Sequence, residues 1–141
     1  MTLNYPDVRE GHIGPLIFDK QADIIADHLN DAKEKGATIM TGGEIENHGG
    51  GKWVKPTVIK DVDHSMKVMT DETFGPVIPV MTYEKIEDAI ELANDTIYGL
   101  SAAVLGGSHE ESSNIAKHID AGAVTVQDCG ATTYVFDGEK N

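Results

Sequence analysis

Glu72 and Phe74 are the residues whose types and spacing best suit the binding of a ring-bearing ligand. They lie in a short polar segment, residues 69–77 (Met-Thr-Asp-Glu-Thr-Phe-Gly-Pro-Val), that leads into an apolar stretch. A carboxylate can accept hydrogen bonds from the vicinal hydroxyls of a ribose, and a phenyl ring offers a flat apolar face to another ring. The alternative, in a chain this acidic, is that Glu72 is a solvated loop carboxylate and Phe74 a core residue.

Cys129 is the one cysteine and hence the one candidate thiol nucleophile. It follows a predicted strand, at a place where open α/β sheets often bind ligands. A nucleophilic thiol needs a nearby positive charge and a positioned base, and no basic residue stands close to Cys129 in the sequence. We therefore expect a small buried hydrophobic residue. A single cysteine also excludes an internal disulfide framework and a zinc site built from several cysteines.

The histidines and one glycine-rich segment are weaker candidates. None of the six histidines has the spacing of a metal-binding pair, so we expect surface residues and no metal site; they are His12, His28, His48, His64, His109 and His118. The segment 49–52 (Gly-Gly-Gly-Lys) resembles part of a phosphate-binding loop, but Trp53 stands where that motif needs a hydroxyl. We expect a flexible loop over residues 44–52.

Composition and charge exclude several classes of protein. The chain has 141 residues, 40% of them hydrophobic, and a formal net charge of -13. A length and composition of this kind are typical of one ordinary globular domain. The negative charge disfavours nucleic acid and membrane surfaces as partners. The sequence contains neither a signal peptide nor an apolar run long enough to span a membrane, so we expect a cytoplasmic protein.

The first half of the chain contains one strong helical pattern. Ala22, Ile25, Leu29 and Ala32 recur at intervals of three and four within residues 19–35, and Gly36 supplies a stop. Residues 37–41 are predicted to form a short strand. Residues 53–59 are predicted to be extended, as an edge strand or an irregular one, because Pro56 cannot donate a ladder hydrogen bond.

The second half alternates between strand and helix. Short apolar strands are predicted at 77–81, 101–105 and 123–126, and the apolar faces of two helices lie between them: Ile86, Ala89, Ile90 and Ala93 in the first, Ile115, Ala116 and Ile119 in the second. Ser108 and Glu111 have capping-box spacing, and Gly122 is the predicted stop of the second helix. The order β-α-β-α-β predicts an α/β fold with an open, mostly parallel sheet and crossover helices.

Several motifs together resemble the aldehyde dehydrogenase superfamily in order and spacing. The two most specific are residues 72–77 (Glu-Thr-Phe-Gly-Pro-Val) and 93–100 (Ala-Asn-Asp-Thr-Ile-Tyr-Gly-Leu). The others are residues 14–17 (Gly-Pro-Leu-Ile), 42–43 (Gly-Gly), 55–58 (Lys-Pro-Thr-Val) and 121–124 (Ala-Gly-Ala-Val). The resemblance covers about residues 11–128 and implies part of that family's catalytic domain, after a polar lead at 1–10 and before a truncated segment at 129–141. Residues 138–141 (Gly-Glu-Lys-Asn) resemble one branch of the family.

The resemblance implies an NAD(P)-dependent enzyme that oxidises aldehydes to carboxylic acids through a thioester on a cysteine. In the family, the glutamate and phenylalanine matched by Glu72 and Phe74 hold the nicotinamide riboside, so these two are the predicted cofactor-binding residues. The family's nucleophile, its oxyanion-stabilising asparagine and its general-base glutamate all lie upstream of the matched region. Cys129 lies far beyond the nucleophile's place.

These departures lead us to expect an inactive polypeptide that binds NAD or NADP weakly or not at all by itself. No catalytic residue is predicted within it. The expected partners are a second copy of the chain or the missing remainder of the enzyme. The alternative is a noncatalytic module for self-association or interaction, derived from the same fold.

Overall fold

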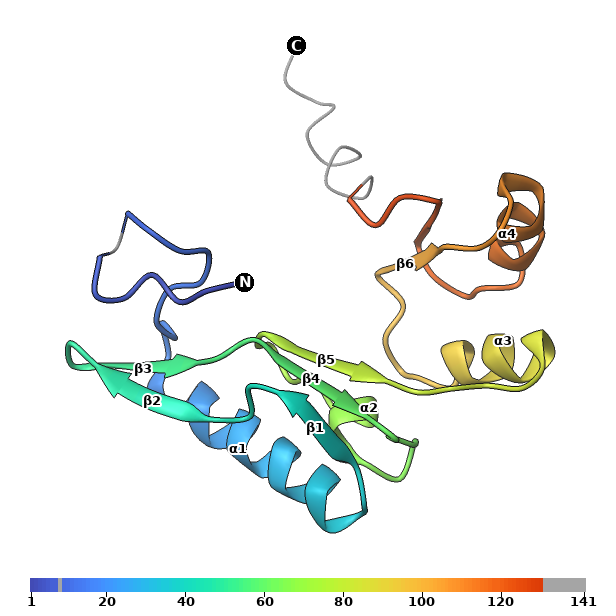
Figure 1. The fold of residues 1–141 in the computed structure, drawn as a ribbon. Helices are drawn as coiled ribbons and strands as arrows, with labels where there is room; N and C mark the ends of the chain where they lie inside the picture. Colours follow the sequence, from blue (N-terminus) through green and yellow to red (C-terminus); the bar gives the residue numbers. More distant parts are fainter. Residues whose placement is uncertain (8, 131–141) are drawn as a thin grey trace. The chain divides into compact units, whose positions relative to one another are not determined.

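The computed structural model describes residues 1–7 and 9–130, arranged in two compact units (Figure 1). The first unit covers Met1–Thr82 and the second begins at Tyr83. Within the described residues, no helix combines the length and the apolar character that crossing a membrane requires. The family-branch motif expected at 138–141 lies outside the described residues.

The main helix of the first unit, α1 (Asp19–Glu34), confirms the helix predicted for 19–35. Its apolar stripe is buried as the spacing requires, with Ile25 and Ala32 fully inaccessible to solvent. Asp19 in the first turn and Lys33 in the last turn both suit the helix dipole. Gly36 follows with a φ of 101°, which supplies the predicted left-handed stop.

A three-stranded sheet packs with α1 in this unit. It contains β1 (Thr38–Thr41), β4 (Thr57–Lys60) and β5 (Val77–Val80), in the order β1-β4-β5. The middle strand pairs antiparallel with β1 and parallel with β5. The short helix α2 (Lys67–Thr70) precedes β5. One core cluster joins residues of α1, β4 and α2 with the connection between them: Ala32, Ile59, Val62, Met66 and Val68.

The flexible loop predicted for 44–52 is wrong, because these residues form most of a β-hairpin. Its strands are β2 (Ile45–His48) and β3 (Gly51–Val54), paired antiparallel. Gly49 and Gly50 form the two-residue turn with φ values of 59° and 83°, and such a turn needs positive φ at both central positions. The extended stretch predicted for 53–59 is interrupted at Lys55 and Pro56, between β3 and β4.

The second unit contains α3 (Ile86–Asn94), β6 (Ser101–Val104), α4 (His109–Ala116) and β7 (Ala123–Val126). The strands β6 and β7 pair in parallel, and α4 packs on both. The Ser108 hydroxyl accepts a hydrogen bond from the Glu111 backbone N–H at 3.1 Å, as the capping spacing predicts. The predicted stop at Gly122 is wrong. The helix ends at Ala116, and the Gly122 N–H instead donates to the Gly99 carbonyl at 2.8 Å.

The α/β fold class is confirmed, and so is the order β5-α3-β6-α4-β7. The described strands are distributed over three small sheets, which contain both parallel and antiparallel pairs. Both parallel pairs have a helix in the chain between their strands, in accord with the need for a crossover connection.

Candidate functional site

Glu72 and Phe74 lie on the connection between α2 and β5, in the first unit. We call residues 71–76 the 71–76 loop. At its start, the Asp71 N–H donates to the Lys67 carbonyl at 2.8 Å. At its end, the Pro76 carbonyl accepts from the Thr57 N–H at 2.8 Å, which ties the loop to the beginning of β4. Both ends of the loop are therefore fixed by backbone hydrogen bonds.

The middle of the 71–76 loop rests on α1. The Gln21 side-chain amide donates to the Thr73 carbonyl at 2.6 Å, and His28 Nδ1 lies 3.0 Å from the Thr73 hydroxyl oxygen. Gly75 approaches the same helix so closely that a Cβ placed there would lie 2.6 Å from Ile25 Cδ1. Glycine at this position therefore permits the close packing of loop against helix.

Phe74 and Glu72 both extend into solvent from this anchored loop. Phe74 has 76% of its surface exposed and a φ of 46°, a conformation uncommon for a bulky side chain. The structure therefore rules out the alternative in which Phe74 is a core residue. Glu72 is also exposed, and its carboxylate has no hydrogen-bond or ion-pair partner within the described part of the chain. Both side chains are accessible to a ligand.

Cys129 is exposed in the second unit, just after β7, so the expectation of a buried hydrophobic residue is wrong. The reason is local. Asp128 Oδ1 accepts from the Gly130 N–H at 2.7 Å, and the Thr125 hydroxyl donates to the Asp128 carbonyl. These bonds form a bend at the surface, which takes Cys129 away from the strand.

The expectation that the histidines lie at the surface fails most clearly for His28, which is only 5% exposed. Its position could have been read from the sequence, because it lies three residues after Ile25 on the apolar side of α1. The contact with Thr73, which is 45 residues away, had no signal in the sequence. Across the described residues, no group of three or more His, Cys, Asp or Glu side chains is arranged to hold a metal ion.

A second cluster involving a histidine joins the N-terminal segment to the hairpin. Tyr5 stacks on His48 with ring centroids 4.5 Å apart, and the Trp53 indole N–H donates to the His48 carbonyl at 3.0 Å. Glu46 lies 2.7 Å from His48 Nε2 and 2.5 Å from Lys55 Nζ. Hydrogen bonds from His48 and Lys55 lower the pKa of the Glu46 carboxyl. All of these residues lie within the first unit, and their contacts hold the N-terminal segment against the hairpin. The lowered pKa of Glu46 therefore has a structural explanation and does not indicate a ligand site.

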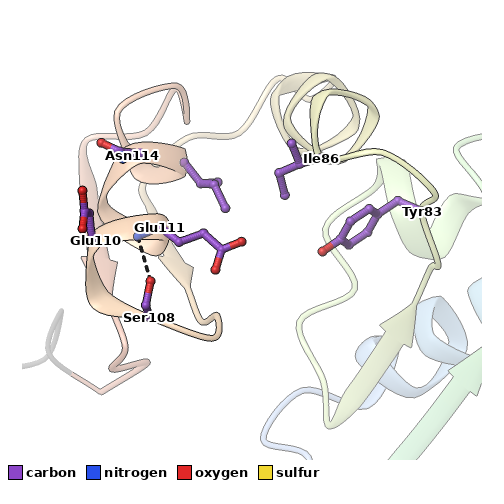
Figure 2. Close-up of a pocket in the computed structure, with 7 residues that line it drawn as sticks. Tyr83, Ile86, Ser108, Glu110, Glu111 and Asn114 are labelled. Atoms are coloured by element: carbon purple, nitrogen blue, oxygen red, sulfur yellow. Dashed lines mark hydrogen bonds between the residues drawn. The ribbon is translucent and has the colours of Figure 1, made fainter.

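An open cleft of about 610 Å³ lies within the second unit. Figure 2 shows Tyr83 and Ile86 directed across it towards Glu111 of α4. The cleft is lined by Tyr83, Ile86, Ser108, Glu110, Glu111, Asn114 and Ile115. Its charged side chains are both carboxylates, so it does not suit the phosphates of a nucleotide. Neither the predicted cofactor residues nor Cys129 line it.

Comparison with known proteins decides the family. The model of the aldehyde dehydrogenase family matches residues 1–141. The chain belongs to the aldehyde dehydrogenase family. The resemblance drawn from the sequence motifs is thereby confirmed, and the 71–76 loop contains all but the last residue of the motif at 72–77.

Relatives of this aldehyde dehydrogenase chain agree with the assignment. A proposed succinate-semialdehyde dehydrogenase [NADP(+)] of Mycolicibacterium smegmatis is 42% identical over 82% of this chain and 22% of its own length. The solved structure of PutA, a proposed aldehyde dehydrogenase of Anabaena variabilis, is 55% identical with a TM-score of 0.91, covering 94% of this chain and 28% of that one. Betaine aldehyde dehydrogenase of Staphylococcus aureus, solved with NAD+, is 36% identical with a TM-score of 0.75, covering 82% and 24%.

The chain thus spans about a quarter of the length of the relatives it matches. The family consists of oxidoreductases, and NAD+ is bound in the betaine aldehyde dehydrogenase structure. The region that these relatives share with the chain includes the 71–76 loop and the helix that supports it.

Proposed function

We propose that this chain is the part of an NAD(P)-dependent aldehyde dehydrogenase that holds the nicotinamide riboside, through Glu72 and Phe74. The Glu72 carboxylate accepts hydrogen bonds from the ribose hydroxyls, and the Phe74 ring packs near the nicotinamide. The observation that carries the proposal is Phe74 itself, an aromatic side chain held 76% exposed at a φ of 46° on an anchored loop. Unusual backbone conformations of this kind are concentrated at ligand-binding sites.

The described residues fit the nicotinamide riboside and little more of the cofactor. Phe74 provides an accessible apolar face, and Glu72 provides a carboxylate with no competing partner among the described residues. Bound NAD(P) supplies the hydride acceptor for oxidation of an aldehyde to a carboxylic acid. The names of relatives support both forms of the cofactor, with NADP in one and NAD+ in another.

A polypeptide of these 141 residues is proposed to be inactive alone. One carboxylate and one ring supply only a small share of the binding free energy of a dinucleotide. Neither predicted cofactor residue is a nucleophile for an aldehyde, and Cys129 lies outside the motif that carries them. The cytoplasmic location expected from the sequence stays a prediction.

Chemical-shift mapping tests the cofactor contact directly. We expect millimolar NAD to shift the backbone amide signals of Glu72 and Phe74, since a small contact gives weak binding. Replacing Glu72 by Gln should reduce the shifts, because the carboxylate is the hydrogen-bond acceptor. The matched control is Glu34→Gln at the exposed end of α1. Shifts that are absent in the wild type, or equal in wild type and Glu72→Gln, would contradict the proposal.

Exposed apolar side chains in the second unit favour a second candidate function, self-association. Ile97 is 90% exposed, Leu100 78% and Leu105 61%. Covering large exposed apolar side chains with a partner removes them from water, which favours association. Sedimentation of the chain over a range of concentrations tests this candidate. A monomer at every concentration would exclude self-association, and a dimer weakened by Leu100→Ser would support it.

A further inference from the structure

We propose that His28 is a positioning residue, which fixes the conformation of the 71–76 loop and so places Glu72 and Phe74. The proposal deepens the cofactor role given above and rests on it for its functional meaning. The claim that His28 fixes the loop is argued separately, from the contacts between α1 and the 71–76 loop. His28 itself does not reach the surface, with 5% exposure, and it therefore acts through the residues that it contacts.

The two ring nitrogens of His28 face the two residues that flank Glu72. Nδ1 lies 3.0 Å from the Thr73 hydroxyl oxygen, within hydrogen-bond distance. Nε2 lies 4.0 Å from Asp71 Oδ2, an ion-pair distance if the ring is protonated. A buried imidazole nitrogen without a partner is unfavourable, so the hydrogen bond with Thr73 is retained whenever α1 and the loop are packed together.

Thr73 is held at both its side chain and its backbone. The hydroxyl meets His28, while the carbonyl accepts from the Gln21 side chain at 2.6 Å. Ile25, one turn of α1 after Gln21, packs against Gly75. Three successive turns of the helix thus contact the loop through Gln21, Ile25 and His28.

The neighbours of Thr73 have no comparable support of their own. Phe74 is exposed, and the Glu72 carboxylate has no partner among the described residues. Their directions are therefore set by the backbone of the residue between them. Fixing Thr73 orders both side chains before a ligand arrives, which lowers the conformational entropy lost on binding.

Amide hydrogen exchange in the full chain, without nucleotide, tests the anchor. His28→Leu removes the hydrogen bond, and we expect exchange of the hydrogen-bonded amides at the two ends of the loop, those of Asp71 and Val77, to accelerate about tenfold. His28→Asn retains a polar nitrogen at the position of Nδ1 and should restore most of the protection. His109→Leu, at the exposed start of α4, is the control and should leave the loop unchanged.

Thr73 supplies a second test in case His28→Leu fails to fold. Thr73→Val keeps the shape of the side chain and removes the hydroxyl, whereas Thr73→Ser keeps the hydroxyl. We expect faster exchange in Thr73→Val and near wild-type exchange in Thr73→Ser. Equal exchange in Thr73→Val and wild type would overturn the proposal, as would acceleration in His28→Asn as large as in a folded His28→Leu.

Titration with NAD separates this proposal from the cofactor role. If NAD shifts no loop amide in the wild type, the cofactor role fails, and the exchange data still decide whether His28 fixes the loop. If NAD shifts the wild-type loop, we expect a folded His28→Leu or Thr73→Val to show weaker shifts at Glu72 and Phe74. Undiminished shifts would overturn the positioning role while leaving the cofactor role intact.

Discussion

Asp31 on α1 accepts a hydrogen bond from the backbone N–H of Lys67, the first residue of α2, at 2.8 Å. The residue before this helix, Met66, makes no side-chain cap. A carboxylate from 36 positions earlier in the chain therefore satisfies one of the free N–H groups at the start of α2. Asp31 also pairs with Lys35 at 2.8 Å. Through α2, this contact supports the start of the 71–76 loop.

The ionisation of Asp31 makes the stability of the first unit depend on pH. Hydrogen bonds from Lys35 and from the Lys67 N–H lower the pKa of the Asp31 carboxyl in the folded chain. Its contribution is complete at neutral pH, well above the unfolded value of about 3.9, and is lost as the pH falls from there through the lowered folded pKa. We expect Asp31→Asn to lower the free energy of unfolding at pH 7 and to have less effect in acid.

Urea unfolding followed by the fluorescence of Trp53 measures this difference, because that indole is 4% exposed. Glu34→Gln on the same helix is the control. An equal effect of Asp31→Asn at neutral and acidic pH would show that the carboxylate charge does not matter.

Gly75→Ala tests the packing of the 71–76 loop against α1. The added Cβ would lie 2.6 Å from Ile25 Cδ1, and Ile25 is fully buried. We expect a loss of about 1–3 kcal/mol in the free energy of unfolding, because a packed core resists added volume. Gly14→Ala is the matched control, since no atom lies within 4 Å of its added Cβ. The two variants are compared by urea unfolding, and equal stabilities would contradict the close approach. Valine lacks the Cδ1 atom that the added Cβ would contact. The double variant Gly75→Ala/Ile25→Val should therefore recover part of the stability lost in Gly75→Ala.

The sequence predicted the elements that local patterns determine. The stripe from Ala22 to Ala32 and the cap at Ser108 both depend on neighbours within a few residues, and both are found as predicted. Long-range contacts were missed because no local pattern encodes them. The bond between His28 and Thr73 joins residues 45 positions apart, and Phe74 is exposed because α1 holds the loop that carries it. Residue type alone does not decide whether Phe74 is a core residue or part of a ligand site.

The hairpin was missed for a different reason. Three consecutive glycines favour a flexible loop, yet the cross-strand pairing from Ile45 with Val54 to His48 with Gly51 selects one turn geometry. Gly49 and Gly50 both adopt positive φ there. Flexibility in the unfolded chain is therefore compatible with a single conformation in the folded chain.

Substitution of Gly50 tests the turn without changing its packing. No atom lies within 4 Å of a Cβ placed at Gly50, and its φ is 83°, so the backbone alone determines the effect. We expect Gly50→Asn to be tolerated and Gly50→Val to cost about 1–2 kcal/mol more, because asparagine adopts the left-handed region more readily than a β-branched residue. Thermal unfolding of the two variants provides the comparison. If valine were tolerated as well as asparagine, the turn would not require positive φ.

The absence of turnover is the prediction that bears most directly on function. The 141-residue chain, given an aldehyde and NAD, is expected to form no NADH, because the two proposed cofactor contacts by themselves supply little transition-state stabilisation. The absorbance of NADH measures the reaction, and mass spectrometry reports any acyl adduct on Cys129. The exposed thiol makes Cys129→Ser the decisive variant. NADH formation that disappears in Cys129→Ser would assign the chemistry to this thiol, and the proposal that the chain contributes only the cofactor contact would then fail.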